Sequence, residues 1–572
     1  MRMKKKNREE ACVKTLRVSV IASLARAATL SAGALGAALV AASTAATAAA
    51  AGAATPLAVA ASASSSTAAA SVDAAIAWRH AASDADIDAA FRQARADVKP
   101  LFLYWGAAWC PPCNQVKATL FNRQEFIERT RAFVAVYVDG DSPGAQKLGA
   151  RFHVGGYPTM VLFSPEGAEL TRLPGEVEPQ RYMEVVTLAI NARRPVKAVL
   201  ASALAGQELH PGDWRLLAFY AWDADEQQLV PKAGRPALLK RLAAACPVAE
   251  AEAGMRLWLQ ALGAGAVPDL GSRARLLALL ADPARARRHF DGLVAAPAEL
   301  TRVLSTRDTP ERAGLRGAFE GALRRFEQDP GLSRADRLSA LGARVELARI
   351  DIPTTLPKAG SQAAPGRLAF RADPGLVAEV REQAARADRD ITDGYERQAV
   401  IPSAASLLAD VGLDREADAL LEANLAKSHS PYYLMSGLAG NAEKRGDRAA
   451  ALRWYRLAYE RSEGPATRLQ WGARYIRALV ELAPADEKRI EAALFQVLDE
   501  SALQSDAFYE RSAASLRRMS TSLRSWNQNA AHAAVMGRFD DRLGAVCKRI
   551  DAADPQRATC HGLLDAAPKK AT

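Results

Sequence analysis

Two cysteines, separated by two residues and placed between an apolar segment and a helix-forming segment, constrain this chain more than any other feature. The run 101–105 (Leu-Phe-Leu-Tyr-Trp) predicts a short, fully buried strand, and the run 114–121 predicts a helix. Cys110 therefore lies at a helix N-terminus, where unpaired backbone N–H groups and the helix dipole favour a thiolate. Cys113, one turn later, is close enough to attack a mixed disulfide formed at Cys110. The pattern predicts dithiol–disulfide exchange.

A CxxC pair can also bind zinc or form an inert structural bridge. A zinc site needs four ligands, usually from a second CxxC or a Cys/His pair, and the sequence has no second CxxC. His153, the nearest histidine, stands alone, and the residues around Cys110 lack the Met and His expected of a copper site. We therefore predict no metal and no cofactor, and we favour redox activity over an inert bridge.

The segments that follow the CxxC narrow the choice of possible folds. The run 133–139 predicts a second buried strand, and 146–154 predicts a short helix and its exit. Residues 155–159 (Gly-Gly-Tyr-Pro-Thr) then lead into an apolar strand over 160–163. With this combination the chain resembles the thioredoxin superfamily, and the resemblance covers about residues 73–193. It implies an α/β thioredoxin fold, with a first strand at 76–78.

The resemblance also assigns roles to individual residues. In the family, a tryptophan precedes the CxxC, and a cis-proline that precedes a strand packs beside the two sulfurs. Trp109 and Pro158 match these positions. The resemblance implies that Cys110 and Cys113 are catalytic and form a redox-active disulfide. It further implies that Trp109, Pro158 and the backbone of Tyr157 contact a protein substrate that carries disulfides or thiols, and that another redox protein resets the dithiol.

Two departures from the family pattern affect the expected chemistry. Thioredoxins carry a buried acid in the strand before the CxxC and a lysine in the following central strand, whereas this chain has Leu103 or Tyr104 and Ala135 there. Asp139 can replace the acid only if it points toward the second cysteine. Pro111-Pro112 replaces the Gly-Pro of thioredoxin. Because the dipeptide between the cysteines tunes the redox potential in the family, the sequence does not distinguish a reductant, an oxidant and an isomerase.

The N-terminus predicts export from the cytoplasm. Residues 1–26 hold eight Lys/Arg and two Glu, and an Ala-rich apolar run over 27–42 and Ala-x-Ala sites follow. This layout is typical of a secretory signal peptide, here over 1–48, and predicts a periplasmic or secreted protein; the alternative is a membrane anchor through 27–42. Residues 49–72 are Ala/Ser-rich and predict a tether. Removing the net charge of +6 of residues 1–26 from the chain's +11 leaves +5, and this mild charge does not support nucleic-acid binding. We also expect no stable membrane span.

The other cysteines fit an oxidising compartment. Cys547 and Cys560 are thirteen positions apart and are a candidate structural disulfide. Cys246 lies in an apolar helical run and is left without an obvious partner.

From about residue 194 the chain becomes rich in Ala, Leu, Arg and Glu, with short breaks at Pro, Gly and Asp. We predict a long all-α region made of stacked helical hairpins, because so many residues cannot form one compact helical domain. A Pro/Gly-containing linker over 353–368 divides it into 194–352 and 369–572.

A short repeat lies in the second part. Gly412 and Gly446 are 34 positions apart, which is the tetratricopeptide period, and residues 402–482 resemble that repeat. Four aromatic residues there either line a concave peptide groove or fill the repeat core: Tyr432, Tyr433, Trp454 and Tyr455.

Two functions fit these observations. The first is an exported thiol–disulfide oxidoreductase that acts on protein disulfides through Cys110 and Cys113, with the helical region docking partners. The alternative is a non-catalytic interaction scaffold that uses a thioredoxin-like module for binding.

Overall fold

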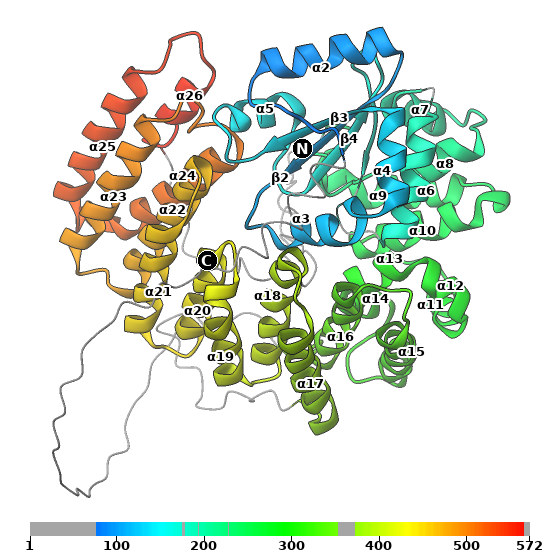
Figure 1. Ribbon diagram of the computed structural model, residues 1–572. Coiled ribbons are helices and arrows are strands. Elements are labelled where there is room, and N and C mark those ends of the chain that lie inside the picture. Colours follow the sequence, from blue (N-terminus) through cyan, green and yellow to red (C-terminus); the bar gives the residue numbers. More distant parts are fainter. Residues whose placement is uncertain are drawn as a thin grey trace, which may run out of the picture.

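The computed structural model describes residues 76–565, except for 174, 176–177, 193, 227 and 353–371 (Figure 1). The expected signal peptide (1–48), its alternative anchor (27–42), the tether (49–72) and the expected linker (353–368) all lie outside the described residues.

A five-stranded mixed sheet forms the N-terminal domain. Its strand order is β1-β3-β2-β4-β5, with β1 and β2 parallel to β3, and with β4 antiparallel to both β2 and β5. The expected first strand at 76–78 is displaced, because residues 79 and 80 pair with β3 while Ile76 packs in the core. The strands are β1 Arg79–His80, β2 Leu101–Gly106, β3 Val134–Asp139, β4 Thr159–Phe163 and β5 Glu169–Leu173.

Both faces of the sheet are buried, which explains why β2 is apolar at every position. Leu103 and Trp105 pack toward α2 (Asp84–Asp97) and α5 (Ala145–Phe152). Phe102 and Tyr104 belong to the core on the other face, because successive strand residues point to opposite sides. That face is covered by α3 (Pro111–Val116), the π-helix η2 (Lys117–Phe121), α4 (Gln124–Arg129) and α6 (Pro179–Ile190). The predicted thioredoxin-like α/β fold, followed by a largely helical region, is confirmed.

The first part of the helical region extends the core of the sheet. Trp214 and Leu217 share one hydrophobic cluster with Leu173 of β5 and Tyr182 of α6. The elements of this part are α7 Val196–Leu204, α8 Pro211–Phe219, α9 Arg235–Ala245, α10 Ala251–Gly263, α11 Ser272–Ala281, α12 Pro283–Arg288, α13 Phe290–Ala295, α14 Pro297–Leu304, α15 Pro310–Gln328 and α16 Arg334–Ala348.

The second part is a series of helical hairpins. Gly412 and Gly446 have positive φ values of 90° and 80° and occupy equivalent turns, after the first helix of successive hairpins. The specific tetratricopeptide assignment of 402–482 stays a prediction. The helices are α17 Pro374–Asp390, α18 Gly394–Asp410, α19 Asp414–Asn424, α20 Pro431–Lys444, α21 Arg448–Arg461, α22 Pro465–Leu482, α23 Glu487–Ala502, α24 Glu510–Trp526, α25 Ala533–Lys548 and α26 Gln556–His561.

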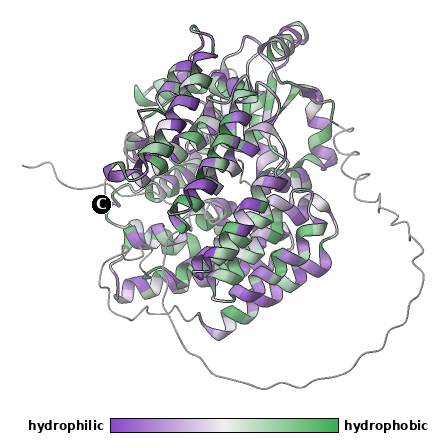
Figure 2. Cartoon of the chain, turned by 90° about the vertical axis from the view of Figure 1, so that its left-hand side faces the viewer, coloured by the Kyte–Doolittle hydropathy of each residue, from purple (hydrophilic) through white to green (hydrophobic). Residues whose placement is uncertain are grey.

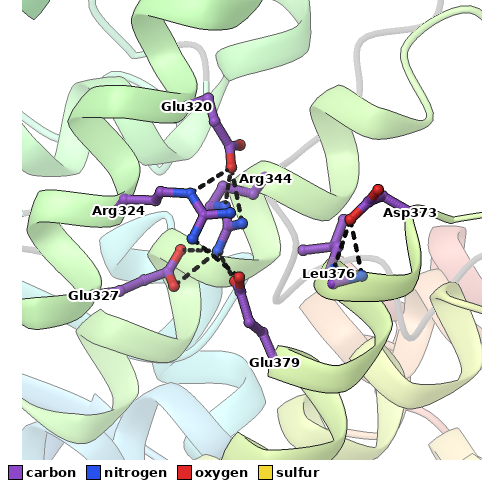
Figure 3. Close-up of polar contacts among 8 residues, drawn as sticks. Glu320, Arg324, Glu327, Arg344, Asp373, Leu376 and Glu379 are labelled. Atoms are coloured by element: carbon purple, nitrogen blue, oxygen red, sulfur yellow. Dashed lines mark hydrogen bonds and ion pairs between the residues drawn. The ribbon is translucent and has the colours of Figure 1, made fainter.

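A buried arginine joins the two parts of the helical region (Figure 3). The Arg344 side chain on α16 is 2% exposed and pairs with Glu320 and Glu327 of α15 and with Glu379 of α17. Arg324 pairs with Glu320 and Glu379 as well. The network therefore ties α17 to helices that precede residues 353–371.

The helical region curves around and returns to the N-terminal domain (Figure 1). Helix α18 packs against α3, and α24 packs against α5. The helices on this side of the molecule carry both hydrophilic and hydrophobic residues, as expected for two-sided helices in a layered array (Figure 2). Within the described ranges, none of the helices is both long and apolar enough to cross a bilayer.

Candidate active site

The two cysteines are joined at the start of α3. Cys110 is the N-cap residue, its Sγ accepts a hydrogen bond of 3.2 Å from the backbone N–H of Cys113, and a disulfide links the two residues across a Cα–Cα distance of 5.3 Å. Pro111 and Pro112 occupy the first two helical positions and carry no N–H. The first backbone donor of the helix is therefore that of Cys113, and it is directed at the Cys110 sulfur. When the bond is reduced, this donor is placed to stabilise a Cys110 thiolate.

Asn114 holds the turn that presents the cysteines. Its buried side-chain amide donates to the carbonyl oxygens of Ala108 (2.7 Å) and Cys110 (2.8 Å). Two hydrogen bonds from one amide fix the loop between β2 and α3. This role of Asn114 was not predicted from the sequence, although a side-chain amide just after a CxxC was a usable signal.

The loop before β4 contains the Tyr157–Pro158 peptide bond, which is cis. The Tyr157 ring lies 6.4 Å from the Trp109 ring, and its hydroxyl accepts a 3.0 Å hydrogen bond from Gln146. Burial raises the pKa of Tyr157 to about 12. Both Tyr157 and Pro158 are half-buried, so this side of the site is less enclosed than the cysteines.

The positions at which the family carries an acid and a lysine are filled by core residues. Leu103, Tyr104 and Ala135 are all buried, and the Tyr104 ring stacks on Tyr137 at 5.2 Å. Asp139 uses its carboxylate to accept a 3.0 Å hydrogen bond from the backbone N–H of Asp141. It thereby stabilises the turn after β3.

The turn after β3 contains a second acid, Asp141, which was not predicted from the sequence as part of the site. Its carboxylate accepts two 2.7 Å hydrogen bonds from Thr467 of α22, one from the backbone N–H and one from the hydroxyl. Burial raises the pKa of Asp141 to about 6 despite these hydrogen bonds. The Thr467 hydroxyl oxygen also accepts a 2.7 Å hydrogen bond from the Trp109 indole N–H. Trp109, Thr467 and Asp141 thus form one chain of hydrogen bonds between the N-terminal domain and the helical region.

Other side chains of the helical region contact the same loop. Gln398 donates to the Trp109 carbonyl at 3.1 Å, and His429 Nε2 lies 3.0 Å from the Ala108 carbonyl. Burial lowers the pKa of His429, which favours the neutral ring with its proton on Nε2 as donor. These two contacts attach the loop backbone to α18 and to the segment before α20.

Aromatic rings complete the enclosure. Tyr433 stacks on Trp109 at 5.9 Å, Trp471 meets the same ring edge-on at 6.2 Å, and the Arg511 guanidinium lies 5.2 Å from it. Arg511 also lies 4.7 Å from the Tyr157 ring. As a result Trp109 is 7% exposed, Cys110 3% and Cys113 0%.

The four aromatic residues that the sequence singled out divide between two roles. Tyr432 and Tyr455 are buried within the helical region, and Trp454 is half-buried there. Only Tyr433 stacks on Trp109 of the candidate site.

The remaining cysteines lie elsewhere. Cys547 and Cys560 are fully buried and joined by a disulfide between α25 and α26. Cys246 is a half-buried free thiol whose pKa is raised to about 11 by burial and by the nearby Glu250 carboxylate. Such a thiol is almost entirely protonated at neutral pH, so it is a poor nucleophile.

Comparisons with known proteins agree with the domain that the geometry defines. Residues 87–189 match the thioredoxin-like domain family and form such a domain here. The thiol:disulfide interchange protein DsbD of Pseudomonas fluorescens is 29% identical over 127 residues, which are 22% of each chain. The thiol:disulfide interchange protein DsbD 1 of Pseudomonas aeruginosa is 29% identical over 105 residues, 18% of each chain. The match therefore spans only about a fifth of these relatives. A solved structure titled DsbH oxidoreductase is 23% identical, covers 21% of this chain and 90% of its own, and has a TM-score of 0.18.

Proposed function

We propose that this chain is an exported thiol–disulfide oxidoreductase that acts on protein disulfides through Cys110 and Cys113. The observation that carries the proposal is the bonded cysteine pair at the start of α3, with the Cys113 N–H directed at Cys110 Sγ. The thioredoxin-like domain and the names of the two DsbD relatives support thiol–disulfide chemistry.

In the reducing direction the reaction has two exchange steps. The Cys110 thiolate attacks one sulfur of a substrate disulfide, which forms a mixed disulfide and releases the other substrate sulfur as a thiolate. The Cys113 thiolate then attacks Cys110 Sγ, which releases the second substrate thiolate and leaves the Cys110–Cys113 bond. Two electrons pass to the substrate, whose thiolates take up protons. A reduced dithiol protein then resets the pair by the same steps, and the oxidising direction is their reverse.

Two further features support an oxidising compartment outside the cytoplasm. One is the basic, apolar and Ala-x-Ala pattern of residues 1–48. The other is the buried Cys547–Cys560 bridge, since structural disulfides persist mainly in such compartments.

The proposal is tested by trapping the mixed disulfide. In the full chain, Cys113→Ser removes the resolving sulfur, so Cys110 should remain linked to its partner. Incubation with periplasmic extract and mass spectrometry without reductant should identify a partner cysteine bonded to Cys110. Exchange activity should fall at least 100-fold in Cys110→Ser, since the thiolate is the nucleophile.

A matched control tests whether partners are captured by the free thiol of Cys246 instead. Cys113→Ser combined with Cys246→Ser should trap the same partners, because Cys246 has a raised pKa. No trapped partner, together with unchanged exchange in Cys110→Ser, would refute the proposal.

The burial of the cysteine pair favours one alternative, a non-catalytic scaffold. A scaffold should capture its partner even when Cys110 and Cys113 are both changed to serine, whereas an oxidoreductase of the proposed kind should lose covalent capture in that variant.

A further inference from the structure

The redox face is defined here as residues 108–113 with Tyr157 and Pro158. The chain's own helical region contacts it at Ala108, Trp109 and Tyr157, and both of its cysteines are buried. Thiol–disulfide exchange requires an incoming sulfur to reach a sulfur of the disulfide, so its rate depends on access. With Cys110 3% and Cys113 0% exposed, a folded protein cannot bring a thiol to either sulfur in this arrangement.

The covering residues come from a regular set of helices. We call the following six residues the cover: Gln398, His429, Tyr433, Thr467, Trp471 and Arg511. Apart from His429, which lies just before α20, they belong to α18, α20, α22 and α24. These helices alternate with α19, α21 and α23, so one side of the array holds the redox face. Tyr433 and Thr467 are 34 positions apart, at equivalent places on successive hairpins.

The surface on which a helical-repeat array would dock a partner is therefore occupied by the chain's own redox face. Its concave side contacts Trp109 through stacking, edge-on and guanidinium contacts. These are contacts that a partner segment could make only after Trp109 leaves.

The cover is attached by hydrogen bonds as well as by the aromatic rings of Tyr433 and Trp471, and α18 packs against α3 beside it. Four direct hydrogen bonds hold the loop and Asp141: Gln398 to Trp109, His429 to Ala108, and two from Thr467 to Asp141. The Trp109 indole adds a fifth, to Thr467, and the backbone N–H of Arg511 donates a sixth, to Gln146 of the N-terminal domain at 3.1 Å. Each can be exchanged for a hydrogen bond to water when the surfaces separate, so its net contribution is small.

We propose that the cover is an autoinhibitory gate, in which Thr467 links Trp109 to Asp141 and the Cys110–Cys113 pair reacts with a protein partner only when the cover is released. This inference rests on the proposed thiol–disulfide exchange and adds its regulation. The gate makes the pair selective, because a small thiol needs a smaller opening than a protein dithiol does.

The test uses the oxidised full-length chain and two reductants. One is a reduced protein dithiol the size of thioredoxin, and the other is dithiothreitol. Reduction of Cys110–Cys113 is followed by acid quenching, alkylation and peptide mass analysis, which separates it from Cys547–Cys560. In the wild type, the rate with the protein dithiol should level off at high concentration, because opening becomes limiting.

Thr467→Val keeps the side-chain shape and removes the hydroxyl that links Trp109 to Asp141. The rate with the protein dithiol should rise about tenfold, as expected when these hydrogen bonds are lost. The rate with dithiothreitol should rise less, so the ratio of the two rates increases. Arg511→Met, at a half-buried position on α24, should change the ratio in the same direction and gives a second variant if Thr467→Val folds poorly.

Thr301→Val is the matched control. Thr301 is also buried, but its hydroxyl donates to Pro297 within its own helix, and its neighbours Leu300 and Leu304 belong to a core that contains no residue of the redox face. This variant should leave the ratio unchanged.

Equal ratios in the wild type, Thr467→Val and Arg511→Met would overturn the gate while leaving the proposed function standing, because the pair would still exchange. If neither reductant reduced the pair in any variant, the proposed function would fail, and the gate with it.

Discussion

The N-terminal domain meets the helical region at two interfaces of different character. The first, which we call the apolar interface, is one continuous hydrophobic core that runs from β5 and α6 into α7–α10 and includes Leu173, Tyr182, Val199, Trp214 and Leu217. The second is the redox interface, to whose cluster the domain contributes the buried residues Ala107, Trp109, Cys110 and Cys113, with Tyr157 packed against it.

The two interfaces differ in the free energy that is lost when their surfaces separate. Opening the apolar interface exposes large side chains to water, and about 25 cal/mol is lost per Å² of apolar surface. Opening the redox interface exposes fewer apolar side chains and replaces hydrogen bonds to Thr467, Gln398 and His429 with hydrogen bonds to water. One interface therefore maintains the fold, and the other is suited to reversible opening.

The largest effect is expected from Trp214→Ala at the apolar interface. Trp214 is 4% exposed, and truncating a buried tryptophan costs about 3–5 kcal/mol. Urea unfolding followed by circular dichroism should show this loss in the transition of the N-terminal domain. A loss below about 1 kcal/mol would mean that this interface contributes little to the fold.

A variant without the Cys547–Cys560 bridge tests whether this second disulfide takes part in the redox chemistry. Changing Cys547 and Cys560 together to serine removes a cross-link that closes a short loop, with an expected loss of about 3 kcal/mol. Calorimetry should show earlier unfolding of the C-terminal helices. Reduction of Cys110–Cys113 should proceed at the wild-type rate, and a loss of exchange would instead make the second bridge part of the redox chemistry.

Gly464→Ala should loosen the redox interface without affecting the apolar one. Gly464 precedes α22 with φ of 86°, and a Cβ there would collide with the Asp141 carboxyl group. The strain is expected to cost about 1–3 kcal/mol. Hydrogen exchange should therefore increase in peptides that contain residues 106–113.

The control for this variant is Gly412→Ala. Gly412 has a similar φ of 90°, but a Cβ there would have no atom within 4 Å. Gly412→Ala should carry backbone strain from its positive φ without a clash, and should leave exchange at 106–113 unchanged. Equal effects of both variants would show that strain alone, and not the contact with Asp141, opens the interface.

The smallest effect is a pH dependence of the redox interface. The pKa of Asp141 is about 6 when buried, against 3.8 for an ordinary aspartate, so the closed state binds a proton that the open state releases. Closure should become about tenfold more favourable between pH 7 and pH 5. His429 acts in the opposite direction, because desolvation lowers its pKa in the closed state and it gains a proton on release.

Asp141→Asn separates the two groups. In this variant, opening of the redox interface is measured by hydrogen exchange at 106–113. Closure should no longer become more favourable between pH 7 and pH 5. An unchanged pH profile would show that Asp141 does not titrate in this range.

Local pattern was sufficient for the elements that carry the chemistry. The strand before Cys110 and the helix after it follow from apolar runs and turn residues, whereas the role of the Tyr157–Pro158 loop was implied by the resemblance to the thioredoxin superfamily. The thioredoxin-like fold implied by that resemblance and the predicted helical remainder are both confirmed. The division into two helical parts and the tetratricopeptide assignment stay predictions.

The partners of the candidate site could not be predicted in the same way. Asp141 and Thr467 are 326 positions apart, and neither has a neighbouring pattern that distinguishes it from other acids or threonines of the chain. Trp109 offered one signal, since a buried indole N–H needs an acceptor, but the sequence did not indicate which residue supplies it.

The amino-acid sequence by itself determined that this chain has a cysteine pair at a helix N-terminus and a long array of amphipathic helices, because such features depend on neighbouring residues. Only the tertiary structure decided that the array curves back over that pair and encloses it. The curvature of a helical array is the sum of small rotations between successive hairpins, and these are set by side-chain packing along its whole length.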